Sequence, residues 1–291
     1  MASTRSWADG WVIKKGVNAM GLFEGKKGLI LGVANDHSIA WAVAQQIMSE
    51  GGQCGFSHLP DRPDDERQRN RRRVAKLTDD CPQAAFLVPM NVSKDEDIQS
   101  VMQRAKEEFG TIDFLLHSIA FASLDDLRRE TVETSRDGFK MAMEISVYSL
   151  ISVCNAARSI FSDNASVLTM TYFGGEKAVP GYNVMGICKA ALDASVRYLA
   201  YDLGPQGVRV NAVSAGPVKT LAGRAAGVEE MLLLYEKMAP LSRNVTHEEV
   251  GKSGSFLLSP AAGGVTGEIL HVDAGYNIMG SPGRLLEGYK S

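Results

Sequence analysis

Residues 182–192 read YNVMGICKAAL, in which Tyr182 stands seven residues ahead of Lys189, and a second tyrosine, Tyr172, lies ten residues earlier. Seven residues of helix turn through about 700°, so Tyr182 and Lys189 share one face, about 10 Å apart along the axis. A phenol has an ordinary pKa of about 10, and beside an ammonium group it can donate a hydrogen bond or a proton to a developing oxyanion. The alternative is a tyrosine packed in a capping loop and a solvated lysine.

The elements that must position these residues are strands and helices in alternation. Apolar runs of strand length recur between helix-length segments, and nearly continuous apolar runs suit strands that are buried on both faces. The predicted strands are Gly28–Val33, Gln53–Leu59, Ala85–Val92, Asp113–Ile119, Ser166–Tyr172, Val208–Gly216 and Glu268–Gly275. This alternation predicts an α/β protein with a Rossmann-type doubly wound sheet of about seven parallel strands flanked by helices. The Tyr182/Lys189 pair then follows the fifth strand of a nucleotide-binding sheet, which favours the chemical role.

Small and polar residues follow four of these strands, at the edge where a parallel sheet binds ligands. The loop after the first strand, GVANDHSIA, departs from G-x-G-x-x-G because Gly32 is its only glycine, and Ser38 stands where a helix cap or a phosphate donor would be. An ordinary capped turn is the alternative for this loop. The later strand ends carry Asn91–Val92, Ser118–Ala120 and Ser214–Val218, the last followed by Lys219 and Thr220. Each stretch alone is more often a turn, but together they predict a dinucleotide site.

The second predicted strand ends in HLPDRP, which bears on the choice of dinucleotide. An acid at this strand end would bind the adenosine ribose 2′-hydroxyl, and an arginine would suit a 2′-phosphate. Leu59 occupies the expected position, with Asp61 and Arg62 just beyond it. We expect NADH as the cofactor, with NADPH as the alternative.

The bulk composition excludes several classes of protein. The weak net charge of −3 gives no reason to expect nucleic acid or an anionic membrane as a partner. No apolar run reaches the roughly 18–20 residues that span a membrane. The four cysteines form no C-x-x-C pair, so we expect free thiols, a reducing cytoplasmic location and no metal site.

Two segments lie apart from the predicted sheet. Residues 1–19 lack the pattern of a signal peptide and are expected to be an N-terminal extension or leader, ahead of a single domain over residues 20–291. The charge run DDERQRNRRRVAK, Asp64–Lys76, is expected to be a solvated helix face with its acids at the N-terminal end. An RNA-binding patch is the weaker alternative, because no aromatic residues are interleaved with the bases.

With these motifs in place, the chain resembles the short-chain dehydrogenase/reductase superfamily. Most members carry Tyr-x-x-x-Lys, but here Met185 stands where that tyrosine would fall. The longer Tyr-x6-Lys spacing, with a second tyrosine upstream, is similar to the bacterial enoyl-acyl carrier protein reductases of type II fatty acid synthesis. The resemblance runs from about Met20 to about Met279, over GVANDHSIA, HSIAFA, TYFGGEKAVPGYNVMGICKAAL, GVRVNAVSAGPVKTLA and HVDAGYNI.

This resemblance implies a role for each residue of the site. Tyr182 would stabilise the enolate oxygen of the thioester, Lys189 would bind the nicotinamide ribose, and Tyr172 would line the acyl pocket in place of the usual serine. Ala122 and Met185 are the other predicted substrate contacts. The predicted cofactor contacts are Gly32, Ser38, Ile39, Leu59, Asn91, Val92, Ser118, Ile119, Lys189, Val218 and Thr220. Residues 219–238 would form a lid over the acyl chain, with an ordinary amphipathic core helix at MLLLYEKM as the alternative for its second half. The partner would be acyl carrier protein carrying the enoyl thioester, and the chain would form a homotetramer.

The spacing of seven also has a chemical interpretation. An enoyl thioester accepts hydride at its β-carbon, so charge develops on an oxygen farther from the nicotinamide than in a carbonyl substrate, and the donor must move with it. A carbonyl reductase on the same fold and a non-catalytic dinucleotide-binding protein are the competing hypotheses. Three positions depart from the family: an acid is usual at Asn91, a polar residue is common at Leu59, and glycine is frequent at Ala120.

Overall fold

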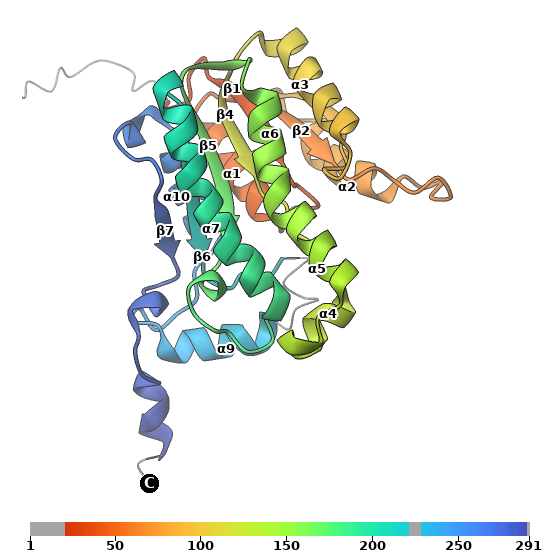
Figure 1. The fold of residues 1–291 in the computed structure, drawn as a ribbon. Coiled ribbons are helices and arrows are strands. Elements are labelled where there is room, and N and C mark those ends of the chain that lie inside the picture. Colours follow the sequence, from red (N-terminus) through yellow and green to blue (C-terminus); the bar gives the residue numbers. More distant parts are fainter. Residues whose placement is uncertain (1–20, 221–227, 290–291) are drawn as a thin grey trace, which may run out of the picture.

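The computed structural model describes residues 21–220 and 228–289, which are built around one twisted sheet (Figure 1). The sheet has the order β3-β2-β1-β4-β5-β6-β7, and every neighbouring pair is parallel. Its strands are β1 (Lys27–Leu31), β2 (Gln53–His58), β3 (Ala84–Pro89), β4 (Ile112–His117), β5 (Phe161–Thr171), β6 (Arg209–Ala215) and β7 (Ile269–Val272). The predicted fold class and all seven predicted strands are therefore confirmed. β5 begins earlier than expected because Phe161 pairs with Ile112 ahead of an irregularity in the ladder.

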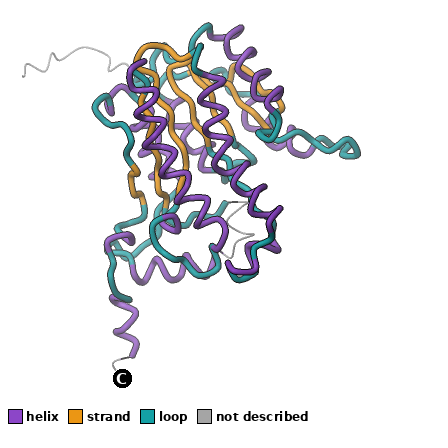
Figure 2. Tube along the Cα trace, in the orientation of Figure 1, coloured by secondary structure: helices purple, strands orange, loops and turns teal. Residues whose placement is uncertain are grey.

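Helices cover both faces of this sheet (Figure 2). One core cluster packs α3, α6 and α7 against the sheet, and a second packs α1 and α10 against the opposite face. The helices are α1 (Ile39–Ser49), α2 (Arg69–Thr78), α3 (Asp95–Phe109), α4 (Leu124–Arg128), α5 (Arg136–Met143), α6 (Ser149–Ala157), α7 (Asn183–Leu203), α9 (Val228–Met238) and α10 (His247–Leu258). A π-helix, Glu144–Tyr148, joins α5 to α6. Within 21–220 and 228–289, no helix is long and apolar enough to cross a membrane.

The direction in which successive strands are added reverses at β1, which lies between β2 and β4. In an open parallel sheet, ligands bind at the carboxyl ends of the strands on either side of such a reversal. Gly32 follows β1 there with φ of 103°, and a Cβ at this position would lie 2.1 Å from the carbonyl oxygen of Ser118. Only glycine therefore allows the ends of β1 and β4 to approach this closely.

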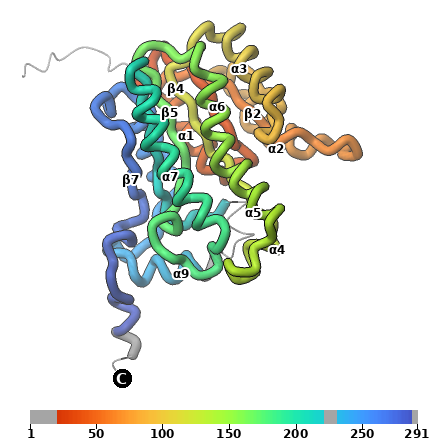
Figure 3. Tube along the Cα trace, in the orientation of Figure 1, coloured from red at the N-terminus to blue at the C-terminus, as the bar shows by residue number. Residues whose placement is uncertain are grey.

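The predicted helix over the charge run is wrong at its N-terminal end. Helix α2 begins at Arg69, so the acids from Asp64 to Glu66 lie in turns ahead of it. The Asp61 carboxylate accepts hydrogen bonds from the backbone N–H groups of Asn70 at 2.6 Å and Arg71 at 3.2 Å, and so caps the helix. In Figure 3 the segment between β2 and α2 projects from the body of the molecule.

Candidate active site

Tyr182 and Lys189 lie at the start of α7, beside the carboxyl end of β5. Tyr182 is the N-cap residue of the helix and is half-buried, whereas Lys189 lies two turns further on and is 6 % exposed. The Lys189 ammonium donates a hydrogen bond to the Met170 carbonyl of β5 at 2.7 Å. This bond holds the lysine head group against the sheet at the edge where the predicted cofactor residues gather.

Burial sets the protonation of both groups. Removal from water disfavours the ammonium form and lowers the pKa of Lys189 to about 8, although the nearby Asp193 carboxylate opposes this shift. Burial also raises the pKa of the Tyr182 phenol above its ordinary value. Tyr182 therefore keeps its proton at neutral pH and can donate a hydrogen bond, as an oxyanion requires.

Tyr172 follows β5 directly and meets Tyr182 edge to face. The two ring centroids are 4.7 Å apart and the ring planes cross at 72°. The approach depends on Gly174, because a Cβ there would lie 2.5 Å from Cδ1 of Tyr182 and 3.1 Å from Cδ1 of Tyr172. The structure thus brings Tyr172 and Tyr182 together, and the bond to Met170 holds Lys189 against the end of the same strand.

The predicted cofactor residues lie at the carboxyl ends of several strands, in keeping with a dinucleotide. Ser38 occupies the N-cap position of α1, but its hydroxyl oxygen caps no helical N–H within the described chain. It accepts instead from the backbone N–H groups of Ala34 at 3.0 Å and Asn35 at 3.1 Å, which closes the loop after β1. Ile39 begins α1, and the backbone N–H of Ser118 donates to the Leu31 carbonyl at 2.9 Å, where β4 ends beside β1.

The remaining cofactor positions differ in their burial. Val92 and Val218 are buried, and Ile119 packs against the core. The backbone N–H of Thr220 donates a hydrogen bond to the Val218 carbonyl at 2.8 Å. The Asn91 side-chain oxygen accepts from the N–H of Ser93 at 3.1 Å. Leu59 directly follows β2, between the ends of β1 and β3, and 63 % of its surface is exposed.

The N–H donors of the Lys189 ammonium group suit a dinucleotide that is bound through its ribose hydroxyl groups. A lysine ammonium has three N–H donors. Within residues 21–220 and 228–289, the Met170 carbonyl is the one acceptor that hydrogen-bonds to Lys189. Hydroxyl groups of a sugar could accept from the other two donors. Among the same residues no cluster of His, Cys, Asp and Glu is arranged to hold a metal ion.

An apolar cluster beside Tyr182 includes two of the three predicted substrate contacts, Met185 and Ala122. Met185 is buried in it with Val147 and Cys188, while Ala122 is half-buried and packs against the cluster. Sequence analysis did not identify Ser146 of the π-helix, whose hydroxyl accepts from the Phe121 N–H at 3.0 Å and donates to the Phe121 carbonyl at 3.1 Å. These paired bonds fix the loop that carries Ala122.

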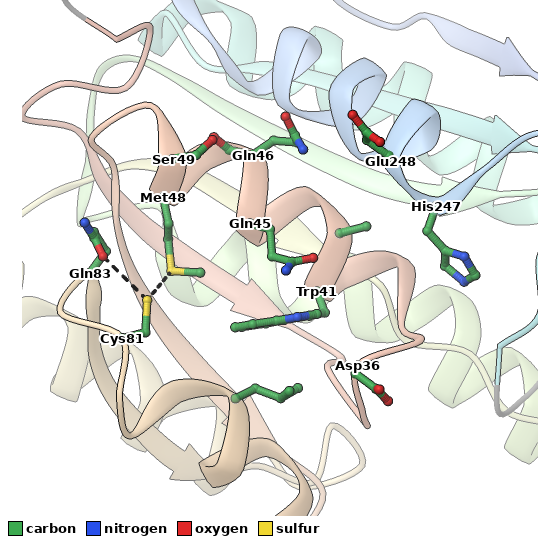
Figure 4. Close-up of a pocket in the computed structure, with 12 residues that line it drawn as sticks. Asp36, Trp41, Gln45, Gln46, Met48, Ser49, Cys81, Gln83, His247 and Glu248 are labelled. Atoms are coloured by element: carbon green, nitrogen blue, oxygen red, sulfur yellow. Dashed lines mark hydrogen bonds between the residues drawn. The ribbon is translucent and has the colours of Figure 1, made fainter.

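Two cavities of about 700 Å³ each lie near the sheet edge. Figure 4 shows the first, which lies between α1 and α10 and is lined by Trp41, Gln45 and Glu248 among others. No residue predicted to be catalytic or to bind cofactor lines it. The second is bounded by His37, Val218 and Lys219 on one side and by Leu232 of α9 on the other, so it adjoins the predicted cofactor site.

The predicted lid is described only in part. Residues 221–227 lie outside the described residues, and α9 forms the rest of the segment. Sequence analysis also missed Tyr235 of α9, whose hydroxyl oxygen lies 3.0 Å from that of Tyr172. No local pattern signals this contact, because the two residues are distant in the sequence.

Asn183 links Tyr182 to α4 and gives a first prediction. Its backbone has φ of 35°, and its side-chain amide donates to the carbonyls of Leu127, at 2.9 Å, and Arg129. Aspartate tolerates a positive φ as asparagine does, but it would place a carboxylate against two carbonyl oxygens. We expect Asn183→Asp to lower kcat/KM for the substrate about tenfold, and the unfolding free energy by about 1–3 kcal/mol. Steady-state kinetics and urea unfolding measure both, and unchanged values in both would contradict the role of Asn183.

This chain is similar to known proteins over most of its length. The sequence model of the enoyl-(acyl carrier protein) reductase family matches residues 32–277. An enoyl-(acyl-carrier-protein) reductase (NADH) from Nostoc is 47 % identical over 257 residues, which is 88 % of this chain and 98 % of the relative. Its counterpart from Bacillus cereus is 45 % identical, over 90 % of this chain and 100 % of the relative.

Solved structures show the same relationship. The enoyl-acyl carrier protein reductase of Bacillus cereus, crystallised with NADP⁺ and indole naphthyridinone, superposes with a TM-score of 0.85 at 44 % identity, over 90 % of this chain and 100 % of that one. The enzyme from Aquifex aeolicus gives a TM-score of 0.84 at 43 % identity, with the same coverage of both chains. With its Tyr-x6-Lys pair at the end of β5, this chain belongs to the enoyl-(acyl carrier protein) reductase family.

Proposed function

We propose that this chain is an enoyl-(acyl-carrier-protein) reductase that uses NADH to reduce the trans-2 double bond of an enoyl thioester during fatty acid elongation. The observation that carries the proposal is the contact between Tyr172 and Tyr182, 4.7 Å apart, beside the buried Lys189 at the carboxyl edge of the sheet. The curated relatives named as NADH enzymes of this type support both the reaction and the cofactor.

Each residue of the site has a distinct role in the reaction. When bound, the dinucleotide supplies a hydride to the β-carbon of the enoyl thioester. Negative charge then develops on the thioester oxygen, and the protonated phenol of Tyr182 donates a hydrogen bond to that oxygen. Uptake of a proton at the α-carbon, drawn ultimately from water, completes the saturated thioester. Lys189 binds the ribose hydroxyls and orients the cofactor, while Tyr172 lines the acyl pocket beside the thioester. The apolar cluster around Met185 excludes water from one side of Tyr182.

NADH is the expected cofactor because the curated relatives are named as NADH enzymes. At the end of β2, Leu59 offers no positive charge to a 2′-phosphate, the exposed Arg62 offers one, and the Asp61 carboxylate is engaged by the N-terminus of α2. A solved relative nevertheless carries NADP⁺. The two dinucleotides are therefore compared directly in the assay below.

The carbonyl reductase alternative requires a phenol one helical turn before Lys189. Met185 holds that position, and it is buried in the apolar cluster. A thioether cannot donate a hydrogen bond to a developing alkoxide. The enoyl thioester is therefore the better substrate class for this arrangement.

Three further properties belong to the same proposal. The substrate is carried by acyl carrier protein, and the enzyme works in the cytoplasm, which the free thiols at Cys54, Cys81, Cys154 and Cys188 support. The chain forms a homotetramer. In support, Ile187, Tyr198 and Tyr201 fall on one face of α7, and the two tyrosines are 74 % and 82 % exposed. Sedimentation that shows a stable monomer would contradict the homotetramer.

The proposed reaction is tested by the loss of dinucleotide absorbance. NADH and NADPH are each supplied with crotonyl-CoA, with a longer enoyl thioester, and with an enoyl thioester on acyl carrier protein. We expect oxidation that depends on the enoyl thioester and is faster with NADH. Folded protein that reduces a β-keto thioester and none of the three enoyl thioesters would favour the carbonyl reductase instead.

A further inference from the structure

Tyr235 of α9 reaches from the predicted lid into the catalytic group. Its side chain is 3 % exposed, whereas its neighbours Leu233 and Leu234 are exposed to solvent. Its hydroxyl oxygen lies 3.0 Å from that of Tyr172, and its ring stacks on Tyr276 with 3.6 Å between the centroids and 11° between the planes. Tyr235 is thus the side chain by which α9 contacts both the end of β5 and the segment after β7.

The position of Tyr276 is fixed by the backbone around it. The Asp273 carboxylate accepts from the N–H groups of Gly275 at 2.9 Å and Asn277 at 2.8 Å. Gly275 has φ of 85°, and a Cβ there would lie 2.9 Å from Cγ of Pro240, so Pro240 packs closely against the turn. The stacked ring of Tyr235 therefore rests on a rigid support, and its hydroxyl group is held in one place.

The protonation of the two phenols determines which hydrogen bonds the Tyr235 hydroxyl group can make. Both phenols keep their protons, because burial raises the pKa of Tyr172 to about 12 and raises that of Tyr235 as well. Within residues 21–220 and 228–289, Tyr235 is the hydrogen-bond partner of the Tyr172 hydroxyl group. If Tyr235 donates, the Tyr172 oxygen accepts and its own proton stays available to another acceptor.

We propose that Tyr235 is a positioning residue, whose hydroxyl group donates to Tyr172 and leaves the Tyr172 proton directed to the thioester in the acyl pocket. The inference rests on the proposed function. Such a chain of two hydroxyl groups also polarises the terminal donor, since each hydrogen bond strengthens the next. The packing of α9 against the end of β5 then also orients the Tyr172 proton toward the thioester.

The test is a double-mutant cycle between the two tyrosines. Tyr235→Phe removes the hydroxyl group and keeps the stacked ring, so we expect kcat/KM for the enoyl thioester to fall about threefold to tenfold with an unchanged KM for NADH. In a Tyr172→Phe background the same change should have no further effect. Losses that multiply in the double variant would overturn the proposal, because Tyr235 would then act independently of Tyr172.

The matched control is Tyr276→Phe, which keeps the stack and removes a hydroxyl group that bonds to no described residue. We expect its kcat/KM within about twofold of the wild type. If Tyr276→Phe and Tyr235→Phe lowered kcat/KM equally, the loss of a hydroxyl group from the stacked rings would explain the effect, and the bond to Tyr172 would not.

Urea unfolding of the four proteins of the cycle (wild type, Tyr235→Phe, Tyr172→Phe and the double variant) separates this inference from the proposed function. If the wild-type protein reduces no enoyl thioester, the proposed function fails, whatever the variants do. The bond is still tested, because Tyr235→Phe should lower the unfolding midpoint in the wild-type background and not in Tyr172→Phe. Equal shifts in the two backgrounds would overturn the bond between the hydroxyl groups, and with it the positioning role.

Discussion

Tyr182→Phe is expected to lower kcat about a hundredfold, with the KM for NADH close to that of the wild type. The phenol is buried enough that its pKa rises, so it is a full donor at neutral pH. Removing a single donor aimed at a developing oxyanion costs about 10²–10³ in rate in a site that excludes water. The ring itself remains, so its edge-to-face contact with Tyr172 is kept.

Pre-steady-state kinetics should show the loss in hydride transfer, and not in cofactor binding. The matched control is Tyr148→Phe at the end of the π-helix, where an exposed phenol loses the same atom. Its kcat should equal that of the wild type. Turnover of Tyr182→Phe within twofold of the wild type would remove Tyr182 from the role of hydrogen-bond donor.

Lys189→Met is expected to abolish measurable NADH binding and to leave a folded protein that is at least as stable as the wild type at pH 7. Methionine matches the unbranched stem of lysine but carries no donor for a ribose. Burial has lowered the pKa of Lys189 from 10.5 to about 8, which corresponds to a penalty of roughly 3 kcal/mol for the charged group. Loss of the bond to the Met170 carbonyl offsets part of the gain.

The pH dependence of this stability difference has a definite sign. Between about pH 8 and pH 10.5 the unfolded chain keeps the Lys189 proton and the folded chain has lost it. Stability of the wild type therefore gains from this group as the pH rises through that range. The advantage of Lys189→Met should be full below pH 8 and should shrink toward pH 10.5.

Urea unfolding at several pH values and NADH titration measure these two effects. The control is Lys106→Met on α3, where an exposed lysine should show neither the stability gain nor the loss of NADH binding. If Lys189→Met bound NADH below pH 8 with the affinity of the wild type, the ribose-binding role of Lys189 would be contradicted. Activity of the wild type should also decline as the pH rises through about 8, where Lys189 loses its charge.

The sequence by itself determined the strands and the fold class, and it placed Tyr182 and Lys189, the predicted catalytic pair, on one face of a helix. Strands such as Leu29–Leu31 are recognisable because burial on both faces demands a continuous apolar run. Tyr182 and Lys189 are recognisable because both lie on one stretch of helix, so their separation in space follows from their spacing. Both patterns lie within short stretches of the chain, so they can be recognised without knowing the tertiary contacts.

Tertiary structure alone decided what surrounds that pair. Tyr235 is 63 residues from Tyr172, and Asn183 is 56 residues from Leu127, so neither contact leaves a periodic signal. The start of α2 was mispredicted because Asp61, nine residues before Asn70, supplies its cap. Such contacts depend on which strand ends and loops the packed sheet brings together, and that packing is set by the whole core.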